Sequence, residues 1–92
     1  MSKFYQGTTI NCYRKVFEES STNPVNASLI EISIYDKANG AEVENQGMIQ
    51  DGVGIYHYNY TITGLTGPYH IKYLIRNGVH NTVAWDSFEA IS

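Results

Sequence analysis

The stretch GIYHYNYTI, residues 54–62, places a large side chain at every second position. The residues on this parity are Tyr56, Tyr58, Tyr60 and Ile62. The other parity is mostly polar, and such alternation is typical of a β-strand with one buried face. The tyrosine row has two interpretations: rings that fill a core between two sheets, or an exposed platform that stacks on sugars or bases. The alternation favours the core, with the outermost ring partly exposed.

The same period-two alternation recurs along the chain, and no long segment shows the spacing of an amphipathic helix. Further strands are expected over residues 8–17, 27–36, 69–78 and 82–91, with a weaker strand pair or irregular return over 41–50. In the clearest of these strands, Ile30, Ile32 and Ile34 share one face. Asn39-Gly40 follows that strand and is a tight-turn signal, because both residues tolerate positive φ.

Two positions interrupt the alternation. Arg14 lies on the apolar parity of residues 8–17, which predicts a bulge or a sheet edge. In residues 82–91 the apolar parity switches between Trp85 and Phe88, which predicts a second bulge.

Six or seven short strands separated by turn signals at intervals of about 8–12 residues predict an all-β fold, a small antiparallel β-sandwich. The 92 residues correspond to one domain, residues 1–92, in which residues 1–7 form a possible N-terminal arm.

Composition narrows the functional classes. A hydrophobic content of 42% is sufficient for a folded globule, and a net charge of −3 argues against a nucleic-acid partner. No run of like charges and no apolar stretch of about 20 residues suggests a membrane partner. The N-terminus has no signal-peptide pattern, so the expected place of synthesis and residence is the cytoplasm. The single cysteine, Cys12, is a nucleophile, an intermolecular cross-link or a small buried hydrophobe, and its apolar parity favours the last.

Two longer segments carry a resemblance. NPVNASLIEISIYDKANGAEV is a proline loop, an apolar strand and an Asn-Gly turn; MIQDGVGIYHYNYTITGLTGPYHIKYLI is a Gly-x-Tyr-x-Tyr strand, a Gly/Pro corner and a second tyrosine strand. With the closing SFEAI, they resemble the immunoglobulin-like modules of phage virion and bacterial surface proteins, and fibronectin type III domains. The resemblance implies an immunoglobulin-like sandwich, in which Tyr69 or Tyr73 anchors the corner. The chain departs from antibody domains in lacking a cysteine pair.

Candidate catalytic groups do not converge. The chain has no nucleophile-elbow, phosphate-loop or histidine-pair metal motif, so we expect no enzyme activity, no cofactor and no metal. The histidines are interpreted as surface residues: His57, His70 and His80. Glu42 and Glu44 share a strand face; with Asp51 they are calcium ligands, or they are charges that protect a sheet edge, which we prefer.

These observations favour a structural or interaction module that joins other protein subunits, including copies of itself, in a phage or virus particle. Its contact residues are expected among exposed apolar side chains: Phe4, Tyr5, Leu74 and Trp85. In that hypothesis the N-terminal arm adds a strand to a neighbour. The alternative is a carbohydrate-binding module that stacks sugars on Trp85, Tyr13 and Tyr35.

Overall fold

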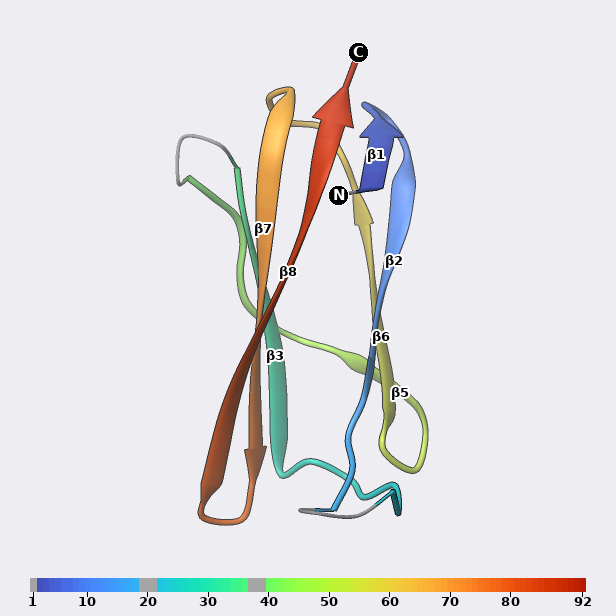
Figure 1. Cartoon of the computed structure of the whole chain (residues 1–92), viewed down its shortest axis with the longest axis vertical. Helices are drawn as coiled ribbons and strands as arrows, with labels where there is room; N and C mark the ends of the chain where they lie inside the picture. Colours follow the sequence, from blue (N-terminus) through green and yellow to red (C-terminus); the bar gives the residue numbers. More distant parts are fainter. Residues whose placement is uncertain (1, 19–21, 37–39) are drawn as a thin grey trace.

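The computed structural model describes residues 2–18, 22–36 and 40–92, which form eight β-strands (Figure 1). They are β1 (Ser2–Tyr5), β2 (Thr9–Lys15), β3 (Leu29–Tyr35), β4 (Ala41–Gly47), β5 (Ile49–Gly52), β6 (Ile55–Thr61), β7 (Gly67–Asn77) and β8 (His80–Ile91). The all-β class is confirmed, with eight strands in place of six or seven. Among the described residues, no helix is long and apolar enough to cross a membrane. Asn39, of the expected Asn-Gly turn, lies outside the described residues.

The strands form two layers. One sheet has five strands in the order β1-β8-β7-β3-β4, and the other has three in the order β2-β6-β5. Figure 1 shows the two sheets side by side along the long axis of the molecule, with β8 crossing the full length of the larger sheet. β1 and β8 pair in parallel, whereas the other neighbouring strands are antiparallel. The five-stranded sheet is therefore mixed, and the predicted antiparallel arrangement was wrong for the pair β1–β8.

The N-terminal segment is part of the sandwich. In β1, Ser2 lies opposite Phe88 and Tyr5 lies opposite Ile91. The Gln6 N–H donates to the carbonyl of Ile91 at 2.8 Å, so the attachment continues beyond the strand. Residues 1–7 were predicted as a possible N-terminal arm; in the single chain, described residues 2–7 bond to the rest of the sandwich.

The tyrosine row occupies β6 and faces the interior. Tyr56 and Tyr60 are buried, Ile62 is completely buried, and Tyr58 is half-buried. The core interpretation of residues 54–62 is confirmed, and the partly exposed ring is the middle one rather than an outer one. A polar strand face opposite such rings is what keeps the register of β6 from slipping by one residue.

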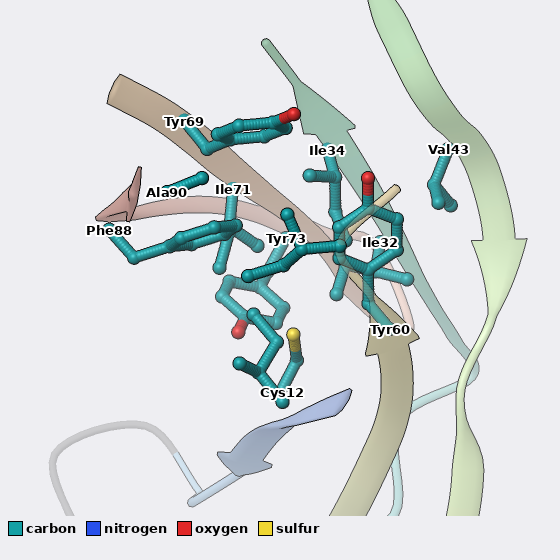
Figure 2. Packing of buried hydrophobic residues seen from close by; sticks show 12 residues of the cluster. Cys12, Ile32, Ile34, Val43, Tyr60, Tyr69, Ile71, Tyr73, Phe88 and Ala90 are labelled. Atoms are coloured by element: carbon teal, nitrogen blue, oxygen red, sulfur yellow. The ribbon is translucent and has the colours of Figure 1, made fainter. Parts of the chain in front are cut away.

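The main core lies between the sheets, where Tyr69, Ile71 and Tyr73 of β7 and Ile32 and Ile34 of β3 meet residues of β2 and β6 (Figure 2). The rings of Tyr69 and Phe88 stack with centroids 4.9 Å apart and planes 10° apart. Phe4 of β1 meets the edge of Phe88 at 6.0 Å. These contacts hold β1 against the core, next to β8.

The irregularities lie elsewhere than expected. β2 pairs with β6 without a register shift and is an edge strand, so of the two alternatives at Arg14 the edge is correct. The guanidinium of Arg14 lies 4.7 Å from the ring centroid of Tyr73, a cation–π contact at the margin of the core. β8 also pairs continuously with β7, so the bulge predicted between Trp85 and Phe88 was wrong: Trp85 lies on the outer face and Phe88 on the inner face of one regular strand.

The irregular pairing is between β3 and β4. The register shifts on either side of Ile34, and Asn45 has a positive φ of 49°. The Asn45 N–H donates to the hydroxyl oxygen of Ser33 at 3.0 Å, which satisfies a backbone group that the ladder leaves open. Such bulges twist an edge strand away from further pairing.

Two core tyrosines differ in their hydroxyl groups. The Tyr69 hydroxyl donates to the carbonyl of Leu65, four residues earlier, at 2.7 Å. The buried Tyr60 hydroxyl has no hydrogen-bond partner among the described residues. Burial, and secondarily the charge of Glu42, raises the pKa of Tyr60 to about 12, since the phenolate is disfavoured away from water.

We therefore expect Tyr60→Phe to stabilise the protein. A buried hydroxyl without a partner costs free energy, so its removal should raise the free energy of unfolding by about 1 kcal/mol. Tyr69→Phe is the matched control, because it removes a hydroxyl that is bonded and should lower the free energy of unfolding by about 1 kcal/mol. Urea unfolding of both variants measures the difference, and a loss of stability in Tyr60→Phe would contradict the assignment.

Candidate functional site

The outer face of the five-stranded sheet carries an exposed apolar patch. Strand register places Ser33, Lys72 and Trp85 in one row across β3, β7 and β8. The next row contains Glu31, Leu74 and Val83, and Tyr35 lies beyond the first row on β3. We call Tyr35, Leu74, Val83 and Trp85 the outer patch.

The outer patch is open to solvent at its β8 side. Trp85 is 59% exposed and Val83 48% exposed, whereas Leu74 and Tyr35 are half-buried. The rings of Tyr35 and Trp85 lie 6.3 Å apart with a tilt of 36°, so they pack against each other across the sheet. Tryptophan and tyrosine gathered on an accessible face, with charged neighbours at the rim, are typical of a contact surface.

The rim of the outer patch is charged and of mixed sign. Glu31 lies beside Leu74 on β3, and Arg76 lies in the row beyond, on β7 between Leu29 and Asn81, whereas Lys72 lies within the patch, between Ser33 and Trp85. Charges at a rim select partners and orient their approach more than they add affinity. The arrangement suits a polar-rimmed protein contact with an apolar centre.

Three of the six contact residues expected from the sequence lie elsewhere. Tyr13 lies on the outer face of the other sheet, opposite His57, and is 46% exposed. Phe4 points inward against Phe88, whereas Tyr5 is exposed at the end of β1. The structure thus brings together Tyr35, Leu74 and Trp85 and separates them from Tyr13, Phe4 and Tyr5.

Hollows lie along the open side of the sandwich, between β2 and the β7–β8 hairpin. Two adjoining hollows of about 280 and 300 Å³ share Val16, Phe17, Ile75 and Thr82, and we call them the hairpin groove. Apart from Ala84, its wider lining is polar: Arg14, Lys15, Asn77, His80 and Asn81. A third hollow of about 230 Å³ lies between β1 and β2 and includes Cys12, Tyr73 and Asp86.

The titratable side chains that the structure describes lie in separate places. Burial raises the pKa of the Cys12 thiol to about 11, so at neutral pH it is protonated and weakly nucleophilic. Nδ1 of His57 lies 2.6 Å from the carboxylate of Asp51 on the outer face of the smaller sheet. Glu42 and Glu44 are exposed on the edge strand β4. In the part of the chain that the structure describes, no three metal-binding side chains gather.

Comparison of the chain with known protein families, with characterised proteins and with solved structures found no match.

Val83 and the residues of the hairpin groove were not recognised from the sequence. Val83 lies on the parity opposite to that of the buried Phe88 and Ala90, and Phe17 lies beyond the end of β2. The sequence did hold a signal that Val83 is exposed. Val83 lies two positions before Trp85, so both side chains share one strand face, and Trp85 was expected to be exposed.

Proposed function

We propose that this protein is a non-enzymatic interaction module that binds another protein through the outer patch. The exposure of Trp85 beside Tyr35 carries the proposal, because aromatic side chains supply most of the binding energy at protein interfaces. The larger assembly expected from the sequence resemblance, a phage or virus particle, is part of the same proposal.

We further propose that the sandwich is immunoglobulin-like. The order β8-β7-β3-β4 corresponds to strands G, F, C and C′ of that fold, and β2-β6-β5 corresponds to B, E and D. The bond from the Tyr69 hydroxyl to the Leu65 carbonyl supports this assignment, since it has the form of a tyrosine corner at the entry to strand F. In such modules the sheet faces and edges are free to bind partners.

Site-specific photocrosslinking tests the outer patch. A photoreactive phenylalanine analogue placed at Trp85, in the organism that encodes the chain, should give a discrete protein adduct. The matched control carries the same analogue at Asn59, an exposed position of the smaller sheet. Equal adducts from both positions would contradict the proposal.

Once the adduct is identified, removal of the apolar centre should weaken binding. We expect the double variant Leu74→Ala/Trp85→Ala to bind the partner at least about tenfold more weakly, because one interface hot spot is worth about 2 kcal/mol. Glu31→Ala, at the rim, should change affinity far less. Titration by calorimetry measures both.

The second candidate is a carbohydrate-binding module. The observation in its favour is the exposed indole of Trp85 with a second ring, Tyr35, 6.3 Å away. A glycan array distinguishes the two functions: a sugar ligand whose binding is lost in Trp85→Ala supports this candidate, and a silent array removes it.

A further inference from the structure

β8 has an open edge along its first half. Residues 80–91 pair with β7 on one side, but β1 covers the other side only from Phe88 to Ile91. Within the described residues, no strand pairs with the other side of residues 80–86. This half of β8 belongs to the hairpin that extends to one end of the molecule in Figure 1.

The direction of the backbone groups follows from the hairpin. Asn77 and His80 are joined by the two-residue loop Gly78-Val79, with a positive φ of 63° at Gly78. Residues that flank such a loop exchange hydrogen bonds, so even-numbered residues of β8 bond to β7. The odd-numbered residues therefore direct their N–H and C=O groups to the open side: Asn81, Val83 and Trp85. The bond from Gln6 to the carbonyl of Ile91, on the β1 side, has the same parity.

The other described edges carry features that discourage further pairing. β4 has Glu42, Glu44 and the positive-φ residue Asn45, and β5 is four residues long. β1 is also four residues long and carries Lys3, and β2 ends with Arg14 and Lys15. Short strands, charges and bulges are the usual protection of a sheet edge. Residues 80–86, HNTVAWD, contain no lysine, arginine or proline, and no register shift interrupts their pairing with β7.

We propose that two copies of this chain pair antiparallel through this edge, with Val83 at the two-fold axis. In that register Asn81 of each copy lies opposite Trp85 of the other, and Val83 lies opposite Val83. Each of these three pairs exchanges two backbone hydrogen bonds, so the contact contains about six. The five-stranded sheets then form one continuous sheet across the dimer.

Charge and shape favour a second copy as the occupant. The same register places Asp86 of each copy opposite His80 of the other, so no two like charges meet across the axis, and symmetry repeats this arrangement. The incoming strand also lies along the mouth of the hairpin groove, whose apolar side chains include Phe17 and Ile75. Phe17 is 48% exposed in the single chain, and the added strand would shield it.

The inference goes beyond the outer patch, because it uses the backbone edge rather than the sheet face.

Sedimentation velocity over rising protein concentration should show a monomer–dimer equilibrium. Val83→Pro removes one N–H on the open edge and so blocks pairing with a second copy. It removes no hydrogen bond to β7, so the variant should stay folded and sediment as a monomer. Val83→Ala trims the outer patch but keeps the N–H, so it should still dimerise. A monomeric wild type, or a dimer that survives Val83→Pro, would overturn the proposal.

A cysteine variant tests the register even if Val83→Pro does not fold. Opposed residues of a hydrogen-bonded pair have Cα atoms about 5.5 Å apart, within the range of a disulfide. Val83→Cys should therefore form a covalent dimer on mild oxidation. Leu74→Cys is the matched control, on the same face but one strand inward, and Cys12 is buried. Equal cross-linking of the two variants would exclude a two-fold axis at Val83. The photocrosslink at Trp85 tests the outer patch separately, so a failure there would contradict the proposed function and not the dimer.

Discussion

Phe88→Ala should strongly destabilise the protein. Phe88 is 2% exposed, stacks on Tyr69 at 4.9 Å and meets Phe4 at 6.0 Å, so its ring joins β8, β7 and β1. Truncation of a buried phenylalanine leaves a cavity that costs about 3–5 kcal/mol. Because small domains have a total stability of about 5–15 kcal/mol, this loss is a large share of it.

Urea unfolding followed by circular dichroism measures the change. Phe17→Ala is the control, since the same atoms are removed from a ring that is 48% exposed and the expected change is within about 1 kcal/mol. We also expect Phe88→Ala to release β1, which would appear as faster hydrogen exchange at Gln6, whose N–H bonds to Ile91. Equal stability of the two alanine variants would contradict the central position of Phe88.

Gly54→Ala should be the second strongly destabilising change. Gly54 has a φ of +69°, and a Cβ at this position would lie 2.6 Å from the carbonyl oxygen of Val16 and 2.9 Å from that of Val25. Both obstacles are backbone atoms held by the bonds from the Val16 N–H to the Gly54 carbonyl and from the Val25 N–H to the Val16 carbonyl. We expect a loss of about 3 kcal/mol or more, from the left-handed conformation together with the clash.

Gly78→Ala separates the two causes. Gly78 also has a positive φ, +63°, but an added Cβ would meet nothing within 4 Å. This variant should lose about 1 kcal/mol, the cost of the backbone conformation alone. The difference in unfolding free energy between the two variants then measures the clash at Gly54, and a difference near zero would contradict it.

Three of the four residues of the outer patch were predictable from the sequence, but their arrangement was not. Tyr35, Leu74 and Trp85 were expected to be contact residues, but nothing in their spacing of 39 and 11 positions places them on one face. Their proximity comes from the register of β3 with β7 and of β7 with β8. Among the described residues, the unpaired edge beside Val83 precedes the part of β8 that β1 covers, where Phe4 packs on Phe88.

The sequence by itself determined the all-β class and the buried parity of most strands, including the tyrosines of β6 and the isoleucines of β3. That information is local, because successive side chains of a strand point to opposite faces and only one parity is apolar. Where both parities are apolar, as at Trp85 and Phe88 of β8, the local pattern was misleading. The tertiary structure alone decided the parallel pairing of β1, the face that Trp85 occupies and the open edge of β8. These features depend on contacts between residues far apart in the chain, and strand parity carries no information on which strands become neighbours.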